Sequence, residues 1–190
     1  MKQLALIFDA DRCIGCRACR AACSLAHGDP PGVSRIKTYT MGPVGEFPRL
    51  NMYFLTVACQ QCGDPACAKA CPTGACFKSA EDGVVRIDEG ACASCGECAH
   101  ACPYGAIDVS GRRVFKCDLC ADTGKIPACV SVCPGEALRV TDEELAEEAR
   151  ALRDDGGLHP SGRIVLRRGE WIDELPAEFE KKLREGRCDG

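Results

Sequence analysis

The sequence lacks any apolar stretch long enough to cross a bilayer, which takes about 20 predominantly apolar residues. The apolar run Leu4–Phe8 is broken by Asp9, and it is too short for the core of a secretory signal. No cleavage site or twin-arginine motif accompanies it. We therefore expect no direct membrane insertion and a cytoplasmic location. The alternative is the periplasm, which the protein would reach as a passenger on an exported partner.

Basic stripes and enzyme signatures are also missing. The 190-residue chain has a formal net charge of −4, and no basic stripe indicates a nucleic-acid partner. There is no Gly-rich phosphate loop and no flavin signature, and His27, His100 and His159 are not paired with a nucleophile pattern. The length fits one domain or two small fused ones. We therefore do not expect the protein to be an enzyme by itself.

Cysteine, by contrast, is abundant and regularly spaced. Sixteen of the 18 cysteines fall into four runs of four. The runs are Cys13, Cys16, Cys19, Cys23; Cys59, Cys62, Cys67, Cys71; Cys92, Cys95, Cys98, Cys102; and Cys117, Cys120, Cys129, Cys133. The first and third read C-x2-C-x2-C-x3-C, and the other two lengthen only the middle gap. This is the spacing of cluster-binding ferredoxins, and it predicts four [4Fe–4S] clusters.

Two other uses of cysteine fit the pattern less well. A disulfide scaffold needs an oxidising compartment, which nothing in the sequence signals. Structural zinc usually takes two well-separated cysteine pairs, often with histidine, whereas three of these runs end in a lone cysteine followed by proline. Iron–sulfur clusters therefore remain the favoured interpretation, and we expect the cluster-free chain to be largely unfolded.

The clusters would make the loaded protein distinctly anionic, since each oxidised cluster with its thiolates adds about −2. Basic residues near the cysteines would partly offset this charge, and the alternative is that they only solvate exposed loops. These residues are Arg12, Arg17, Arg20, Lys69 and Lys116.

The sequence repeats itself around the runs. Strand-like stretches follow three of them, at 76–78, 107–109 and 138–140, and a further strand precedes the first run at 4–8. Gly-centred turns then predict hairpins with returning strands at 84–87 and 114–115. We expect the fourth cysteine of each run to lie on a short helix and to reach a second cluster, so that runs exchange their last ligands.

Two segments carry no cysteine run. Residues 24–58 form an insertion, with strands predicted at 36–40 and 52–57 and loops at 29–32 and 42–45; we expect most of it to cover a cluster. Residues 141–190 form a tail, with a helix predicted from Thr141 to about Arg153, a strand at 163–167 and a helix from Pro176. The tail either embraces a partner subunit or is a solvated cap.

A few single residues stand out near the runs. We interpret Cys76 as a buried small hydrophobe rather than a ligand, and we assign no role to Cys188. His100 is expected to hydrogen-bond near a cluster, and Asp64 and Asp118 to be turn residues.

At this point the sequence resembles a known family. The four runs, the Cys-Pro endings and the phrases CPYGA at 102–106 and KCDLC at 116–120 resemble the four-cluster iron–sulfur subunits of molybdenum and tungsten bis-pterin oxidoreductases. Such subunits serve dimethyl sulfoxide, thiosulfate, polysulfide and nitrate reductases and formate dehydrogenases. Similar ones serve some hydrogenases, carbon monoxide dehydrogenases and aldehyde oxidoreductases. The resemblance covers residues 3 to about 141.

The resemblance implies how the ligands are shared. The first run pairs with the fourth (module A), and the second with the third (module B). The implied ligand sets are Cys13, Cys16, Cys19 and Cys133 for cluster 1; Cys117, Cys120, Cys129 and Cys23 for cluster 2; Cys59, Cys62, Cys67 and Cys102 for cluster 3; and Cys92, Cys95, Cys98 and Cys71 for cluster 4. It also implies that cluster 1 faces a catalytic subunit and cluster 4 the outlet.

Together these observations predict an α+β protein. Residues 1–140 would form two fused bacterial-ferredoxin-like modules with short hairpins and helices, and residues 141–190 a C-terminal helical docking tail. Its function would be to relay electrons through four [4Fe–4S] clusters to or from a catalytic molybdenum or tungsten pterin subunit, with a second redox partner at the other end. The alternatives are a free polyferredoxin carrier and a zinc-bound scaffold.

Overall fold

The structure, a computed structural model, describes residues 4, 6–44, 46–123, 125–140, 165–167 and 170–171. Within these residues the fold is α+β, as predicted. Short helices alternate with two-stranded hairpins along the sequence, and one four-stranded sheet gathers strands from distant parts of the chain. The elements are short because much of the sequence between them is ligand loop.

The beginning and end of the cysteine-rich region meet in one sheet. Strand β1 (Leu6–Asp9) precedes the first run, and strand β8 (Leu138–Val140) follows the fourth. The two strands pair antiparallel, with Phe8 opposite Leu138. This pairing brings the first and fourth runs to the same end of the molecule.

The tail contributes two further strands to this sheet. Strand β9 (Val165–Arg167) pairs with β1 in parallel, and β10 (Glu170–Trp171) pairs with β9 antiparallel, so the strand order is β10-β9-β1-β8. The strand predicted at 163–167 is therefore present in its described part. The helices predicted after Thr141 and from Pro176, and Cys188 with them, lie outside the described residues.

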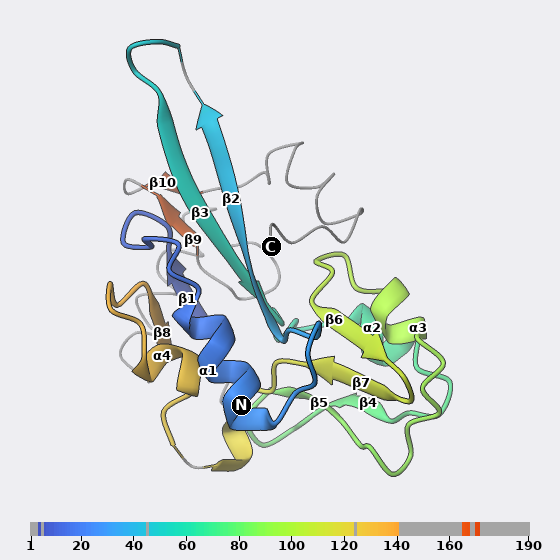
Figure 1. Cartoon of the computed structure of the whole chain (residues 1–190). Helices are drawn as coiled ribbons and strands as arrows, with labels where there is room; N and C mark the ends of the chain where they lie inside the picture. The colour runs from blue at the N-terminus through green and yellow to red at the C-terminus, as the bar shows by residue number, and fades with distance from the viewer. Residues whose placement is uncertain are drawn as a thin grey trace.

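The insertion forms a long hairpin that projects from the body of the molecule (Figure 1). Strands β2 (Ile36–Val44) and β3 (Asn51–Ala58) pair antiparallel from Ile36 opposite Ala58 outward. The loop predicted at 42–45 was wrong in part, because β2 continues to Val44. The pairing register breaks between Met41 and Val44, so the Gly-Pro sequence is accommodated as an irregularity inside the strand rather than as its end.

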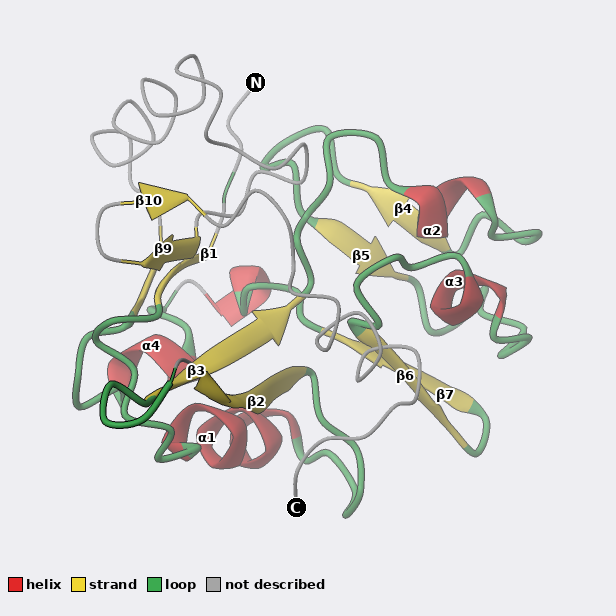
Figure 2. Cartoon of the chain, turned by 90° about the horizontal axis from the view of Figure 1, so that it is seen from above, coloured by secondary structure: helices red, strands yellow, loops and turns green. Residues whose placement is uncertain are grey.

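Two smaller hairpins follow the second and third runs, as predicted. Strand β4 (Cys76–Lys78) pairs with β5 (Val85–Ile87), and β6 (Ile107–Ser110) pairs with β7 (Arg113–Lys116). Both pairs are antiparallel. Figure 2 shows them on the opposite side of the β2–β3 hairpin from the helix that follows the first cysteines.

Three short helices correct a prediction about the fourth cysteine of each run. Helices α2 (Ala66–Lys69), α3 (Glu97–His100) and α4 (Ala128–Ser131) each carry the third cysteine of a run, and each ends before the fourth. The cause is the proline that follows the fourth cysteine. A residue before proline is disfavoured in the helical region, so the helix cannot include it.

The first run lacks this proline, and its helix is correspondingly longer. Helix α1 (Ala18–His27) carries both Cys19 and Cys23, continues through Ser24 and ends at Gly28. The expected helical fourth cysteine is therefore found here alone among the four runs. It also follows that residues 24–27 belong to α1 rather than to the insertion. A 3-10 turn, η1 (Ala121–Thr123), fills part of the long middle gap of the fourth run.

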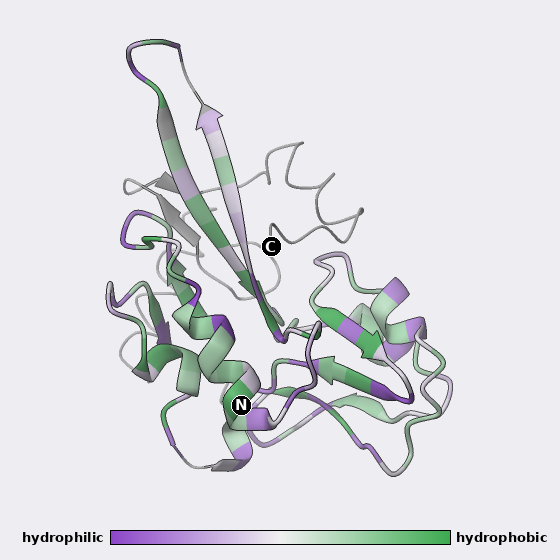
Figure 3. Cartoon of the chain, viewed as in Figure 1, coloured by the Kyte–Doolittle hydropathy of each residue, from purple (hydrophilic) through white to green (hydrophobic). Residues whose placement is uncertain are grey.

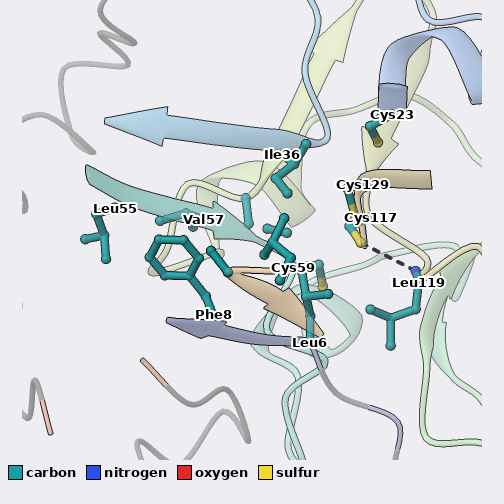
Figure 4. Close-up of a cluster of buried hydrophobic side chains, with 14 of the residues drawn as sticks. Leu6, Phe8, Cys23, Ile36, Leu55, Val57, Cys59, Cys117, Leu119 and Cys129 are labelled. Carbon is teal, nitrogen blue, oxygen red and sulfur yellow. Dashed lines mark hydrogen bonds between the residues drawn. The ribbon is translucent and has the colours of Figure 1, made fainter. Parts of the chain in front are cut away.

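The main core lies between β1, β3 and the first and fourth runs. Figure 3 shows hydrophobic residues along β3 where it enters this core. Phe8, Ile36 and Leu55 are almost fully buried there, and Figure 4 shows Cys23, Cys117 and Cys129 within the same cluster of side chains. A second, smaller core lies under the β4–β5 and β6–β7 hairpins. In the described part of the protein, no helix is long and apolar enough to cross a membrane.

Candidate metal centres

The same backbone conformation recurs in all four cysteine runs. The residue directly before the second cysteine has a positive φ in each case: 69° at Gly15, 50° at Gln61, 56° at Ser94 and 58° at Leu119. Three of these residues are not glycine and adopt the left-handed region at a cost. A turn of this kind directs successive backbone N–H groups into one concavity, an arrangement found at many iron–sulfur sites.

Some of these N–H groups donate hydrogen bonds to cysteine sulfur. The amide nitrogen of Leu119 lies 3.4 Å from Cys117 Sγ, and that of Ala137 lies 3.2 Å from Cys133 Sγ. Such bonds favour the deprotonated thiolate, which is the form that binds metal.

Two of the predicted ligand sets line cavities. One cavity is lined by three cysteines of the first run and the last cysteine of the fourth: Cys13, Cys16, Cys19 and Cys133. A second is lined by the last cysteine of the second run and three of the third: Cys71, Cys92, Cys95 and Cys98. We call these sets group 1 and group 4.

The other two sets gather in the interior. Burial raises the pKa of Cys23, and the negative charges of three fourth-run thiolates raise it further. These three are Cys117, Cys129 and Cys120, and with Cys23 they form group 2. Burial likewise raises the pKa of Cys62 to about 11, with added repulsion from Cys59, Cys67 and Cys102, which complete group 3. The structure thus brings together the members of all four predicted sets.

Neighbouring groups approach one another through single pairs of thiols. Burial raises the pKa of Cys129 to about 12, and Cys19 of group 1 contributes alongside the thiolates of group 2. The charges of Cys59 and Cys67 raise the pKa values of Cys117 and Cys98 in the same way, after burial. The three close pairs, Cys19–Cys129, Cys59–Cys117 and Cys67–Cys98, link the groups in the order 1, 2, 3, 4.

Exposure of the cysteines differs along this order. Among the described cysteines, Cys16 and Cys95 are the exposed ones, and the others are buried or half-buried. Cys16 belongs to group 1 and Cys95 to group 4. The two ends of the series therefore reach the surface, whereas its middle does not.

Threonines of the β2–β3 hairpin cover group 1. Thr38 and Thr56 face each other across the two strands with their Oγ1 atoms 3.3 Å apart. Thr38 Oγ1 lies 3.9 Å from Cys19 Sγ, and a hydrogen bond from Thr56 lowers the pKa of Cys13 against the larger effect of burial, which raises it. The sequence gives no local signal for this contact, because the threonines are separated from the cysteines by the whole of α1.

Cys76 is buried, as predicted, but it also contacts ligand candidates. A hydrogen bond from the Cys76 thiol lowers the pKa of Cys67 to about 6. The backbone nitrogen of Cys76 lies 3.3 Å from Cys71 Sγ, and this bond lowers the pKa of Cys71. Cys76 thus lies between groups 3 and 4.

The histidine expected near a cluster was the wrong one. His100 is exposed, and its ring makes no hydrogen bond to any residue that the structure describes. Instead, His27 lies one helical turn after Cys23 on the same face of α1, with its Nδ1 3.9 Å from Cys23 Sγ and its Nε2 3.9 Å from Cys120 Sγ. His27 reaches group 2 because α1 extends past Cys23, whereas α3 ends at His100.

An ionic network supports group 2. Asp118 accepts a hydrogen bond from the backbone of Cys120 at 2.9 Å, as expected for a turn residue, and its carboxylate also lies 3.4 Å from His27 Nε2. Arg35 from the insertion lies 3.7 Å from Asp118 and binds the buried carboxylate of Asp29 at 2.9 Å. This network fixes the insertion to the loop of the fourth run.

Basic side chains divide into solvated and buried ones. Lys69 is 65% exposed and pairs with Asp64, in agreement with a solvating role. Lys116, by contrast, is only 3% exposed, and its ammonium donates hydrogen bonds to the carbonyls of Val85 and Cys117. A solvating role is therefore wrong for Lys116. Sequence alone does not distinguish the two lysines, because both lie within two residues of a cysteine of the runs.

Known families and relatives match this chain. The families described as "4Fe-4S dicluster domain" and "4Fe-4S binding domain" match residues 50–143 and 4–25. The "Protein NrfC homolog" of Haemophilus influenzae is 40% identical over 147 residues, which is 74% of this chain and 65% of that protein. The "Thiosulfate reductase electron transfer subunit PhsB" of Salmonella typhi is 38% identical, over 72% of this chain and 74% of that protein. The B subunit of the anaerobic dimethyl sulfoxide reductase of Escherichia coli is 40% identical, over 72% of each.

The protein therefore belongs to the family of electron-transfer iron–sulfur subunits of the molybdenum oxidoreductases. The family expected from the cysteine runs is confirmed. The protein is an electron-transfer component rather than a catalytic one, and its cofactors are [4Fe–4S] clusters. These families give no support to a zinc-bound scaffold.

Proposed function

We propose that each of the four cysteine groups holds one [4Fe–4S] cluster. The donor set fits the cofactor, because each group offers four thiols and clusters of this type take four thiolates. The buried thiols in these groups repel one another when ionised, and bound iron would relieve this repulsion. When bound, each cluster would supply a one-electron redox couple. The protein's own residues hold the ligands, donate hydrogen bonds to sulfur and limit access of water.

The ligand exchange implies a two-module architecture, which we also propose. Groups 1 and 2 both combine the first and fourth runs, and groups 3 and 4 both combine the second and third. The β1–β8 pairing supports the first module, and the second core under the two small hairpins supports the second. Each module would be a bacterial-ferredoxin-like unit with two clusters side by side.

A linear electron path through this protein is the function that the geometry supports best. The observation that carries it is the series of close thiol pairs between groups, with exposed cysteines at the two ends. Electrons would enter at one end, pass through the interior and leave at the other. A path buried in the middle protects the electron from reaction with solvent, while the exposed ends allow exchange with partners.

We propose that the Cys16 end faces a catalytic molybdenum or tungsten pterin subunit, and that the Cys95 end faces a second redox partner. The printed names of relatives support the first part, since thiosulfate and dimethyl sulfoxide reductases are assemblies with a catalytic subunit. The alternative is a free polyferredoxin without a permanent partner. Purification from native extracts separates the two: a stable complex supports the proposal, and a monomer contradicts it.

Replacing Cys23 by serine tests the ligand exchange. We expect the Cys23→Ser protein to lose or alter the cluster at group 2, whose other ligands belong to the fourth run, while the group 1 signal persists. Iron content should fall from about sixteen towards about twelve per chain if the cluster is lost. Cys76→Ser is the matched control, because Cys76 is a buried cysteine outside the four groups. Loss of the group 1 signal in Cys23→Ser, with group 2 unchanged, would show that each run closes on its own cluster.

The tail can be tested by two truncations. We propose that residues 141–190 contribute to docking. A protein ending after Trp171 retains β9 and β10, whereas one ending after Val140 loses the strand that pairs with β1. We expect both to keep their iron and both to bind the catalytic partner more weakly. Unchanged affinity of both truncated proteins in a pull-down with that partner would contradict a docking role.

We further propose a cytoplasmic location, with export on a signal-bearing partner as the alternative outcome. Fractionation of cells that produce the native complex, followed by detection of this protein in the periplasm, would refute the cytoplasmic proposal.

A further inference from the structure

Two lysine side chains point their ammonium groups at the loops of group 3. Lys116, at the end of β7, donates hydrogen bonds to the carbonyls of Val85 and Cys117, the latter at 2.8 Å. Lys78, at the end of β4, donates to the carbonyl of Cys62 at 2.9 Å and to that of Gly83 at 2.8 Å. Both ammonium groups are therefore held in place by backbone oxygens of the ligand loop and the β4–β5 hairpin (Figure 1).

The burial of Lys116 is unusual for a lysine. Its side chain is 3% exposed, and among the residues that the structure describes no carboxylate forms an ion pair with it. A buried cation is costly unless a negative charge lies nearby. The negative charges beside Lys116 are cysteine thiolates: it acts on Cys67 of group 3 and on Cys117 of group 2.

Lys78 acts on the same group from another side. Its positive charge interacts with the thiolates of Cys62 and Cys59. Group 3 is therefore flanked by two fixed cations. At group 1 the leading charges acting on Cys13 are other thiolates, and the same holds for Cys98 in group 4.

The other cation near an inner group is already neutralised. Arg35, beside group 2, binds the carboxylates of Asp29 and Asp118. Its net effect on the thiolates is correspondingly smaller. The asymmetry between groups 2 and 3 thus comes from how their cations are paired.

We propose that Lys116 and Lys78 are potential-setting residues, which raise the reduction potential of the cluster held by group 3. The proposal rests on the ligand sets proposed above. Reduction adds one negative charge to a site that is already anionic, and a fixed cation nearby favours the reduced state. The charge matters more in the interior, where solvent screens it less. The lysines would thus draw the electron toward the inner half of the path.

The contacts of the two lysines predict different signatures. Lys78→Met should lower one of the four midpoint potentials, that of group 3. Lys116→Met should lower the same midpoint and, because it also lies beside Cys117, that of group 2 to a smaller extent. We expect a shift at group 3 equivalent to at least a tenfold change in the ratio of reduced to oxidised cluster, which is about 59 mV for one electron.

The experiment is an anaerobic redox titration of the full chain followed by electron paramagnetic resonance, with iron content measured on every sample. Cys102→Ser identifies which midpoint belongs to group 3. Lys69→Met is the matched control, since it removes the same charge two residues from Cys67 but from an exposed side chain paired with Asp64. Its midpoints should stay at their wild-type values.

A second variant separates charge from hydrogen bonding. Lys116→Gln keeps an N–H donor for the carbonyl groups but removes the charge, so it should shift the potential as Lys116→Met does. Full iron content with unchanged midpoints in Lys78→Met and Lys116→Met would overturn the proposal while leaving the four clusters intact. Loss of iron from both Lys116 variants would assign that residue to folding and would overturn it equally. Wild-type protein without four clusters would instead refute the proposed function.

Discussion

Gly15→Ala offers a direct test of the first ligand loop, because two separate costs apply at this position. Gly15 has φ of 69°, and a Cβ added there would lie 2.4 Å from the ring of Phe54. The left-handed backbone alone costs about 1–2 kcal/mol for alanine. Moving the Phe54 ring out of contact adds about 1–3 kcal/mol, the usual cost of overpacking.

Gly111→Ala is the matched control. Gly111 has a similar φ of 59° in the turn between β6 and β7, but an added Cβ would meet nothing within 4 Å. It therefore carries the backbone cost without the steric one. In a protein of this size, about 1 kcal/mol corresponds to about 2–4 °C in melting temperature, so Gly15→Ala should melt about 2–12 °C below Gly111→Ala.

The assay is thermal unfolding of the cluster-loaded proteins under argon at one fixed scan rate, followed by circular dichroism. The double variant Gly15→Ala/Phe54→Ala should recover part of the difference, because removing the ring removes the clash. Equal melting temperatures for the two glycine variants would show that Phe54 does not restrict the loop, and the reasoning from close approach would fail.

Four further outcomes follow from the contacts described above. Arg35→Met should destabilise the protein by about 3–5 kcal/mol, because it leaves the buried Asp29 carboxylate unpaired, whereas Arg12→Met, at an exposed ion pair with Glu136, should change stability by less than about 1 kcal/mol; denaturation under argon compares them. Thr38→Val should lower the midpoint potential of the group 1 cluster by removing a hydroxyl near Cys19, and a redox titration with unchanged midpoints would contradict this. Hydrogen bonding from Arg86 holds the pKa of Asp82 well below its usual range, so this pair stabilises the fold above the unfolded-state pKa of about 4 and less as pH falls below it; the advantage of wild type over Asp82→Asn in iron-release half-life should shrink over that range, while Glu89→Gln tracks wild type. Removing iron with a chelator under reducing conditions should abolish near-ultraviolet circular dichroism, and a retained native spectrum would show that the fold does not depend on the clusters.

Local elements of this protein could be predicted because they depend on neighbours in the sequence. The Gly-centred turns after Lys78 and Ser110 specify hairpins, and both are present. The spacing of the cysteines specifies the ligand loops and thereby the cofactor class. The error about helices had a local cause too, since the proline after the fourth cysteine excludes that cysteine from the helix.

The sequence by itself therefore determined the iron–sulfur chemistry, the number of cysteine groups and the hairpins. It did so because thiolate spacing and turn residues act over a few positions. The tertiary structure alone decided which side chains surround each group. Thr38 reaches Cys19 because the insertion folds back over α1, and His27 rather than His100 lies beside a thiol because α1 continues past Cys23. Lys69 and Lys116 look alike in sequence, yet one is solvated and the other buried. Their difference arises from strands that pair only after distant segments meet, and such long-range packing leaves no periodic signal in the sequence.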